Sequence, residues 1–419
     1  MKRQKRYSRG IFSLKYFSIL VALFLLFVTD VYLLKKETLF AWAEIREALK
    51  IGWQKLEIPS RVSNGVWARE IGYKIIKEQN IKPPILYQEI IFPDIRNARC
   101  HLVLCDIKDP HIQIKPVIAG DKIAGLRETV ESMTRRSGAV VGVNASYYGY
   151  WNTTTPIGDL LGQIVIDGEI VSSINQLRPW HNGAFGITED RDILIERPLF
   201  FKAVLTTKNN ETFKGLTINP LDWQDKSQIL IYTDRVGNIP IKLKSKKGYL
   251  LKLLSPERLI VNTTIKAKVM GEFEGVVVPE GNYCLIYGLK KAEEFIKKNV
   301  KKGDVVYLSI IYPKKWRSVK QVIGGAPQIL KDGEIIIKDE PMELENRTAI
   351  GVTQDGKMLI VCSENVTWYE TAEMMKRLDT KDALMLDGGG STSLIIEGGN
   401  VFKKQRCVGD SLLIYYNEK

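Results

Sequence analysis

The sequence predicts an α+β fold with mixed, largely antiparallel sheets and a few packed helices, preceded by one N-terminal transmembrane helix. Short apolar runs recur from residue 98 to the C-terminus, and turn signals such as Asp167-Gly168 and Asp355-Gly356 separate them, as is typical of hairpins. Helical spacing of apolar residues is confined to a few short segments between these runs. An apolar segment beside a basic cluster near the N-terminus predicts the transmembrane helix.

The net charge of +13 over 419 residues resembles that of a nucleic-acid-binding protein until the charges are located. Residues 1–36 contain eight basic side chains and one acidic side chain, whereas the remaining chain contains 53 basic and 47 acidic side chains. The basic density therefore lies beside the apolar segment, where it indicates membrane topology. We expect no nucleic-acid partner.

The apolar segment covers residues 16–34 and is interrupted only by Asp30. Its uncharged part, 16–29, is short enough to be the core of a signal peptide, and Ala41-Trp42-Ala43 fits a small-x-small cleavage pattern. That pattern lies beyond Lys35-Lys36, far from the apolar run. The sequence therefore favours an uncleaved signal anchor with a cytoplasmic N-terminus.

Residues 35–96 combine apolar and charged residues with helical spacing, as in Trp42, Ile45 and Leu49, and prolines interrupt them. This pattern fits a helical stalk or linker that lifts the following domain off the membrane. A small helical subdomain packed on that domain fits equally well. The predicted organisation is a basic cytoplasmic tail, a single-pass anchor in the cell membrane, a stalk and an extracytoplasmic domain, at residues 1–15, 16–34, 35–96 and 97–419.

The chain has five cysteines, an odd number, and no two of them form a CxxC pair, which excludes a disulfide scaffold and a zinc ribbon. Cys100 and Cys105 are predicted to lie on opposite faces of one strand, about 17 Å apart, too far for a disulfide. With only three histidines in the chain, a His-rich metal site is not expected. We therefore predict free buried thiols, no metal and no cofactor.

Strands dominate the domain, with a few helices between them. A hairpin is predicted from the strands 101–109 and 112–118, closed by Asp109-Pro110, and a buried strand at 139–143 ends at Asn144. Further elements are expected at 129–137 (helix), 163–171, 184–194, 228–233, 250–254, 264–270, 290–299 (helix), 305–311, 347–352, 358–361 and, after a Thr367–Glu370 capping box, a last helix.

The stretch 382–394 carries the clearest signal for chemistry. A strand at 383–386 delivers Asp387 to its end, three glycines follow, and a second alternating strand covers 392–397. Glycine allows a ligand to approach the backbone, and successive exposed amides in such a loop suit an anion. A tight turn between strands with Asp387 as its cap is the structural alternative. The loop is not a P-loop, because it contains no Gly-Lys-Ser/Thr.

Four segments follow one another between residues 98 and 417, and they resemble the phosphodiester glycosidase family. They are Asn144-Ala-Ser-Tyr-Tyr148, Gly324-Gly-Ala-Pro327, Asn346-Arg-Thr-Ala-Ile-Gly351 and Met385-Leu-Asp-Gly-Gly-Gly-Ser391. The family's known activity is that of an N-acetylglucosamine-1-phosphodiester α-N-acetylglucosaminidase, and many bacterial members are linked to exopolysaccharides. Ala145, Ser146 and Met385 depart from the family pattern, and these departures concern the sugar specificity more than the chemistry.

The resemblance implies cleavage of a glycosyl phosphodiester, whose phosphate monoester is a good leaving group that needs little general-acid help. The reaction needs a carboxylate, as nucleophile or to activate water, and we assign this role to Asp387. Arg347 is the predicted phosphate clamp, because a guanidinium binds phosphate oxygens bidentately; a structural ion pair is the alternative. Backbone amides and a hydroxyl are expected from Gly388, Gly389, Gly390 and Ser391.

Five further residues are candidates for the site. Asn144 ends a strand, where it is expected to hold a sugar hydroxyl or to form a turn. Glu364 and Asp159 are candidates for a second carboxylate, with a surface charge as the alternative for each. His181 is a candidate acid or base, and Gly325 belongs to the predicted substrate loop.

The sequence thus predicts a membrane-anchored, extracytoplasmic hydrolase of sugar-1-phosphodiester linkages in surface polysaccharide or cell-wall polymer. Two other functions remain open at this point. One is glycosyl transfer in the synthesis or modification of exopolysaccharide, and the other is a glycan-binding module that has lost turnover. The expected partners are a phosphate-linked glycan and the membrane.

Overall fold

The computed structural model describes residues 72–418, except 124–126, 150–159, 174–181, 221–227, 238–240, 243–247, 275, 278, 338–342 and 403–405. The chain divides into two units, 1–66 and 67–419, and all of the described residues belong to the second unit. The predicted tail, anchor and first part of the stalk lie outside the described residues. Within the described part of the chain, no helix combines the length and the hydropathy needed to cross a membrane.

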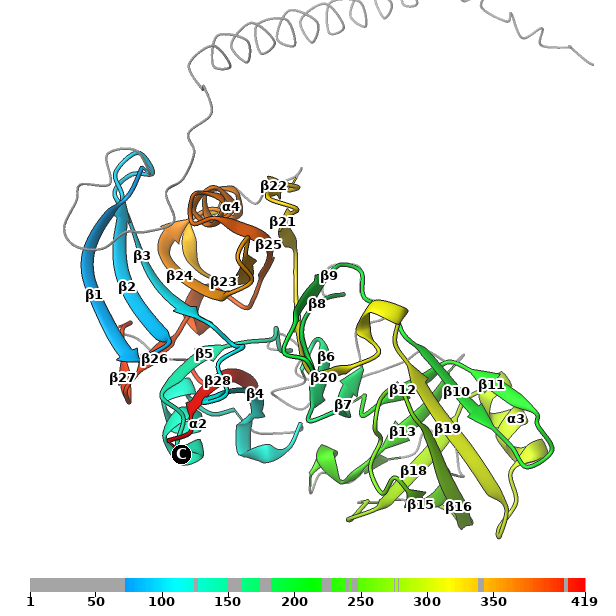
Figure 1. Cartoon of the computed structure of the whole chain (residues 1–419). Helices are drawn as coiled ribbons and strands as arrows, with labels where there is room; N and C mark the ends of the chain where they lie inside the picture. Colours follow the sequence, from blue (N-terminus) through cyan, green and yellow to red (C-terminus); the bar gives the residue numbers. More distant parts are fainter. Residues whose placement is uncertain are drawn as a thin grey trace, which may run out of the picture. The chain divides into compact units, whose positions relative to one another are not determined.

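The first eight-stranded sheet is antiparallel throughout and is drawn in blue, orange and yellow in Figure 1. Helix α4 (Trp368–Arg377) packs on one face, where it shares a core with Ala383 and Met385. In spatial order the strands are β1 (Lys74–Lys82), β2 (Ile85–Phe92), β3 (Ala98–Cys105), β24 (Met358–Val366), β23 (Glu345–Thr353), β25 (Thr380–Met385), β21 (Gln328–Lys331) and β22 (Glu334–Ile335).

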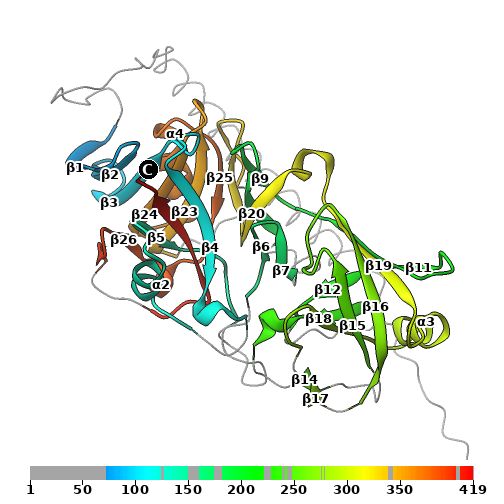
Figure 2. The ribbon, with the colours of Figure 1, turned by 60° about the horizontal axis from the view of Figure 1, so that its bottom comes forward.

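Two five-stranded antiparallel sheets lie next to the first eight-stranded sheet, and β25 contacts β8 and β9 of one of them. In Figure 2, β28 can be followed beside β4 and β5. Helix α2 (Val130–Ser137) contacts β5 and β28 and ends at Gly138, whose φ is +69°. One sheet has the order β7 (Glu169–Ser173), β6 (Gln163–Ile166), β20 (Val319–Gly325), β8 (Gly183–Thr188), β9 (Ile193–Glu196); the other has β27 (Gly399–Asn400), β26 (Leu394–Ile396), β5 (Val141–Asn144), β28 (Asp410–Tyr416), β4 (Ile112–Ile118).

A second eight-stranded sheet contains the middle of the chain. Its pairs are antiparallel except for β12 with β13, and α3 (Lys291–Asn299) packs against β18. In spatial order the strands are β11 (Thr212–Lys214), β10 (Lys202–Thr206), β19 (Val305–Ile311), β16 (Thr264–Phe273), β15 (Gly248–Ser255), β18 (Tyr283–Gly288), β13 (Ile229–Tyr232) and β12 (Leu216–Ile218). A separate pair joins β14 (Ile241–Lys242) to β17 (Val276–Val277), and short 3-10 turns lie at η1 (Ala119–Asp121), η3 (Asp234–Val236), η4 (Lys314–Trp316) and η5 (Gly389–Ser391).

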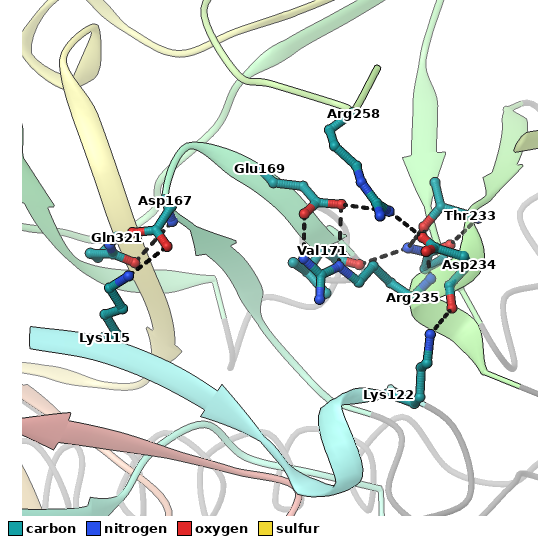
Figure 3. A network of polar contacts seen from close by, with 11 residues as sticks. Lys115, Lys122, Asp167, Glu169, Val171, Thr233, Asp234, Arg235, Arg258 and Gln321 are labelled. Atoms are coloured by element: carbon teal, nitrogen blue, oxygen red, sulfur yellow. Dashed lines mark hydrogen bonds and ion pairs between the residues drawn. The ribbon is translucent and has the colours of Figure 1, made fainter. Parts of the chain in front are cut away.

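Charged side chains link β7 to the turn η3, as Figure 3 shows. The Glu169 carboxylate accepts from Arg235 Nε at 3.2 Å and from Arg235 Nη2 at 2.5 Å. Arg258 Nη1 lies 2.5 Å from Asp234 Oδ1 and 3.8 Å from Glu169, and Lys122 Nζ donates to the Asp234 carbonyl at 2.8 Å. Each of these charges faces a partner of opposite sign or a carbonyl, so the group acts as a structural link between the two elements.

Strand β25 of the first eight-stranded sheet is buried on both faces near its end, which explains the unbroken apolar run before Asp387. Leu384 and Leu386 belong to the core on one face, and Ala383 and Met385 belong to the core under α4 on the other. Strands covered on both sides have continuous rather than alternating hydrophobicity. By the same alternation Asp387 is expected on the face of Ala383 and Met385, toward α4.

Most local predictions are confirmed, including the α+β fold with its largely antiparallel sheets. The Asp167-Gly168 turn joins β6 to β7 with both φ values positive, at 50° and 83°. The capping box forms at Thr367 and Glu370. All five cysteines are free; four are buried as predicted, whereas Cys407 is exposed. Cys100 and Cys105 belong to different cores on the two faces of β3.

Two predictions about the start of the domain are wrong. Residues 74–92 form the paired strands β1 and β2 rather than part of a helical stalk, because their backbone groups extend the sheet beyond β3. The predicted hairpin of 101–109 and 112–118 does not form: β3 pairs with β2 and β24, whereas β4 pairs with β28 in another sheet. Adjacent strands that read as a hairpin are thus divided between two sheets.

Candidate active site

The main chain of Asp387 is fixed between two sheets. Strand β25 ends at Met385, and the next strand, β26, begins at Leu394 in a five-stranded sheet. The Asp387 N–H donates to the Ala145 carbonyl at 3.1 Å, and the Asp387 carbonyl accepts from Asn144 Nδ2 at 2.6 Å. Both backbone groups of Asp387 are therefore held by the last residue of β5 and the residue that follows it.

Asn144 is the residue that joins these segments. It is fully buried, and its Oδ1 accepts from Thr348 Oγ1 at 3.1 Å and from the Ser393 N–H at 3.0 Å. Because Nδ2 donates to the Asp387 carbonyl, both the oxygen and the nitrogen of the side-chain amide form hydrogen bonds within the protein. The geometry gives Asn144 a positioning role, and the predicted contact with a sugar hydroxyl stays a prediction.

A pocket of about 230 Å³ opens beside Asp387 on the α4 side of the sheet. Asp387 and Arg347, predicted from separate sequence segments, both line it. Trp368, the first residue of α4, also contributes to its wall. The remaining lining residues are Tyr147, Glu343, Glu345, Met385, Leu386 and Gly388. The pocket thus combines carboxylates, one guanidinium and two aromatic rings.

Arg347 is held firmly in the pocket wall, with a side chain only 7% exposed. Its Nε donates to the Val366 carbonyl at 3.1 Å, Nη2 to the Glu343 carbonyl at 2.6 Å and Nη1 to Glu345 Oε2 at 3.1 Å. Its guanidinium also lies 5.7 Å from the Trp368 ring centroid. A guanidinium has five N–H donors, so these three bonds leave two for a ligand. Burial lowers the pKa of Arg347.

Burial of the Asp387 carboxyl group raises its pKa to about 6. The Ser391 side chain, the Gly388 N–H and the charge of Arg406 oppose this rise, and the charge of Glu345 adds to it. A carboxyl group with a raised pKa in a pocket is typical of catalytic sites, although structural charges also shift pKa values. Near neutral pH Asp387 is mostly ionised, which is the form that a nucleophile or base requires.

Three glycines follow Asp387, and the first of them, Gly388, lines the pocket. The Gly388 N–H donates to Asp387 Oδ1 at 3.1 Å, and residues Gly389–Ser391 make the 3-10 turn η5. Gly389 has a φ of +59°, which L-residues with a side chain rarely adopt. Within the described residues, the N–H groups of Gly389 and Gly390 have no acceptor, so they are available for an anion.

Glu345, Arg406 and Tyr147 are among the residues of the site that were not predicted from the sequence. Glu345 lies two positions before Arg347, and that spacing on a strand was a usable signal. The Arg406 guanidinium lies 3.6 Å from the place where a β-carbon at Gly390 would stand, and no motif marks it. The Tyr147 hydroxyl donates to the Ala326 carbonyl at 2.7 Å, which connects the pocket to the Gly324–Pro327 segment.

Asp410 is a buried carboxyl group behind the site. Its two oxygens accept from the N–H and the hydroxyl of Ser146, both at 2.8 Å, and the same hydroxyl accepts from the Gly324 N–H at 3.2 Å. Burial raises the pKa of Asp410 to about 7, and the charge of Asp387 adds to this rise. In the sequence, Asp410 stands out as a charged residue at the start of the apolar strand β28.

Two other predicted site residues, Glu364 and Gly325, do not line the pocket. Glu364 lies on the face of β24 that points away from α4, and its Oε1 lies 3.7 Å from His101 Nε2. Gly325 is buried against β25, with the Met385 carbonyl 2.5 Å from the place of a β-carbon. Asp159 and His181 lie outside the described residues. No group of three potential metal ligands occurs in the part of the chain that the structure describes.

Comparison with solved structures places the fold among known proteins. A hypothetical protein from Synechocystis matches with a TM-score of 0.63 and 16% identity over 83% of this chain and 68% of that one. A protein from Burkholderia pseudomallei matches with a TM-score of 0.58 and 17% identity over 78% of this chain and 74% of that one. At such identities the likeness concerns the fold alone.

A third structure is similar over most of its length but superposes less well. The catalytic domain of zebrafish N-acetylglucosamine-1-phosphodiester α-N-acetylglucosaminidase, auto-inhibited by its pro-peptide, has a TM-score of 0.41 and 15% identity over 83% of this chain and 89% of that one. A score this low does not establish a shared fold. A search among curated proteins finds no match in sequence.

A family model supplies the sequence match. The model described as phosphodiester glycosidase covers residues 257–415, which include Arg347, the glycine loop and Asp387. Three of the four segments that carried the resemblance lie within this range, and Asn144–Tyr148 lies before it. Residues 257–415 of this chain therefore match the phosphodiester glycosidase family.

Proposed function

We propose that this protein is a glycosidase that hydrolyses sugar-1-phosphodiester linkages in surface polysaccharide or cell-wall polymer. One observation carries the proposal: Asp387, fixed at the end of β25, shares a pocket of about 230 Å³ with Arg347, and its pKa is raised to about 6. The family match over residues 257–415 supports the same reaction class.

The groups around Asp387 suit the two halves of such a substrate. The phosphate can accept hydrogen bonds from the Arg347 guanidinium and from the amides of Gly389 and Gly390. Arg406, beside Gly390, adds a positive charge near these amides. Trp368 and Tyr147 supply the apolar ring faces on which a sugar packs. The bond that breaks is the one between the anomeric carbon and its oxygen, and the electron pair leaves with the phosphate monoester.

The reaction is tested with a nitrophenyl phosphodiester of a sugar 1-phosphate and the full-length chain in detergent. A glycosidase releases nitrophenyl phosphate, so colour develops only after alkaline phosphatase is added. A phosphodiesterase that breaks the bond to nitrophenol gives colour without phosphatase. Colour that needs phosphatase supports the proposal, whereas immediate colour or no turnover on a panel of sugars contradicts it.

The same assay separates the remaining functions. Added sugar acceptors that divert the glycosyl unit from water into a new glycoside would show transfer rather than hydrolysis. Saturable binding of the phosphodiester without turnover would show a glycan-binding module. Both outcomes leave the pocket as a carbohydrate site but remove the hydrolase assignment.

The proposed location is extracytoplasmic, with the protein anchored in the cell membrane by residues 16–34. The basic cluster before this apolar segment supports a cytoplasmic N-terminus. Protease added to intact cells should then remove the C-terminal domain. Complete protection of the domain until the cells are lysed would contradict this location.

A further inference from the structure

A second carboxylate lies in the same pocket as Asp387. Glu345 is the first residue of β23, and it lines the pocket together with Asp387 and Arg347. Its Oε2 lies 3.3 Å from the place where a β-carbon at Gly389 would stand. The Glu345 carboxylate therefore borders the glycine loop that follows Asp387.

The two oxygens of this carboxylate have different surroundings. Oε2 accepts from Arg347 Nη1 at 3.1 Å, which fixes the orientation of the group. Among the described residues, Oε1 has no donor, and the side chain is 47% exposed. One oxygen is thus anchored by a buried guanidinium, while the other is available to water.

A purely structural role explains this arrangement poorly. An ion pair with one half-exposed partner contributes little to stability, typically about 0–1 kcal/mol. Arg347 is already held by two carbonyl groups, those of Val366 and Glu343, and β23 by its pairing with β24 and β25. The fold therefore does not need the Glu345 carboxylate, whereas hydrolysis requires a group that takes a proton from water.

We propose that Glu345 is a catalytic residue, the general base that activates the attacking water. This inference rests on the proposed function and assigns the nucleophile's role to Asp387. In the first step an Asp387 oxygen bonds to the anomeric carbon, and the bond to the phosphate oxygen breaks with its electron pair. In the second step Glu345 takes a proton from water as the water oxygen bonds to the anomeric carbon. The bond to Asp387 then breaks, its electron pair returns to the carboxylate, and Glu345 releases the proton to solvent.

The test uses the full-length chain in detergent, the phosphatase-coupled nitrophenyl phosphodiester assay and two variants. Glu345→Gln should lower kcat by about 10²–10⁴-fold, the usual contribution of a general base. Glu345→Ala should be equally slow. Sodium azide should raise its turnover at least about tenfold, because azide is already an anion and attacks without the help of a general base. The restored reaction should yield the glycosyl azide, which needs no proton transfer.

Glu334→Gln is the matched control. Glu334 is also paired with a cation, Lys376 at 2.8 Å, but its side chain is 76% exposed and does not line the pocket. This variant should keep the parent kcat and show no response to azide. A melting curve of each variant confirms that the compared molecules are folded.

The outcomes separate this inference from the proposed function. Turnover by the parent with an unchanged kcat in folded Glu345→Gln overturns the base assignment alone. A slow Glu345→Ala variant that azide does not restore, and that forms no glycosyl azide, assigns Glu345 to support of Arg347 and also overturns it. No turnover by the parent overturns the proposed function, and the base assignment falls with it.

Discussion

Two glycine-rich segments of this protein use glycine for different reasons. The first loop, Gly324–Pro327, continues from the end of strand β20, and the second loop, Gly388–Gly390, follows Asp387. At Gly324 and Gly325 an added β-carbon would lie 2.6 Å from the Gly162 α-carbon and 2.5 Å from the Met385 carbonyl oxygen. At Gly390 the nearest atom would be Arg406 Nη1 at 3.6 Å, an ordinary contact distance. The first loop lacks side chains because backbones meet there. In the second loop only Gly388 would meet a backbone atom, the Asn346 carbonyl at 3.0 Å; Gly389 has a positive φ, and Gly390 has room for a methyl group.

Each loop also has its own carboxyl group. Asp410 holds the first loop through Ser146, whose hydroxyl accepts from the Gly324 N–H, and Asp410 is fully buried. Asp387 precedes the second loop and lines the pocket. The comparison teaches that a glycine motif alone does not identify a binding loop. What distinguishes the two loops is the space around their α-carbons. Changes at the first loop should therefore affect stability, and changes at the second loop and Asp387 should affect turnover.

The largest effect is expected for Asp387→Asn, which keeps the volume of the side chain but removes its charge. Turnover should fall by about 10³-fold or more, within the range for a lost catalytic group. The melting temperature at neutral pH should not fall, because burial disfavours the charged form of Asp387. Kinetics and a melting curve on one purified variant provide both quantities. Retained turnover with a lower melting temperature would instead make Asp387 a turn cap.

Gly325→Ala should show the opposite pattern. Its β-carbon would meet the Met385 carbonyl and the Leu384 side chain at 2.5 and 2.6 Å, so the backbones of two sheets must separate. Overpacking of this kind costs about 3 kcal/mol of unfolding free energy. Denaturant unfolding measures this loss, and the turnover of the molecules that remain folded should be close to that of the parent. An unchanged free energy of unfolding would remove the packing explanation.

The pH dependence of stability should reflect both carboxyl groups. Their pKa values in the folded chain are raised to about 6 for Asp387 and about 7 for Asp410, above the value of about 3.9 in an unfolded chain. The stability from these groups is therefore fully present below about pH 4 and is lost as pH rises through 6 and 7. Asp410→Asn should remove about 2–3 kcal/mol of this decline, as urea unfolding at pH 4.5 and 8 would measure. An equal decline in parent and variant would contradict the assignment.

Arg347→Lys tests the guanidinium of the second loop's pocket. A lysine cannot reproduce a planar fork that bonds two carbonyls and Glu345 while it presents two further donors. We expect a loss of about 2 kcal/mol in kcat/KM for a phosphodiester and a smaller loss for a neutral aryl glycoside. Equal losses on the two substrates would make Arg347 a structural residue.

Gly390→Ala should have the smallest effect of the five. The added methyl group would meet only Arg406 Nη1 at 3.6 Å, and the backbone N–H would remain available. Stability should change by less than about 0.5 kcal/mol, and kcat/KM by less than about threefold. Differential scanning calorimetry and the coupled assay measure these changes. A loss of stability as large as that of Gly325→Ala would erase the difference between the two loops.

The sequence by itself determined the local features of this protein. The Asp167-Gly168 turn, the Thr367 capping box and the strand that ends before Asp387 depend on residues a few positions apart. Their physical causes, backbone preferences and short-range hydrogen bonds, are visible in a short window. Asp387 was singled out from such a local pattern, whereas Arg347 was predicted from the family resemblance, and the two residues do share a pocket.

Only the tertiary structure decided which strands pair and which charges meet. The exposed residues of β1 fit a helix as well as an edge strand until β2 supplies its hydrogen-bond partners. Strands β3 and β4 adjoin in sequence but pair with β24 and β28, more than 250 residues later. Glu345, Arg406 and Asp410 surround Asp387 because these long-range pairings bring their strands and loops together. Pairing between distant strands depends on the summed burial of whole sheets, which no short window of sequence contains.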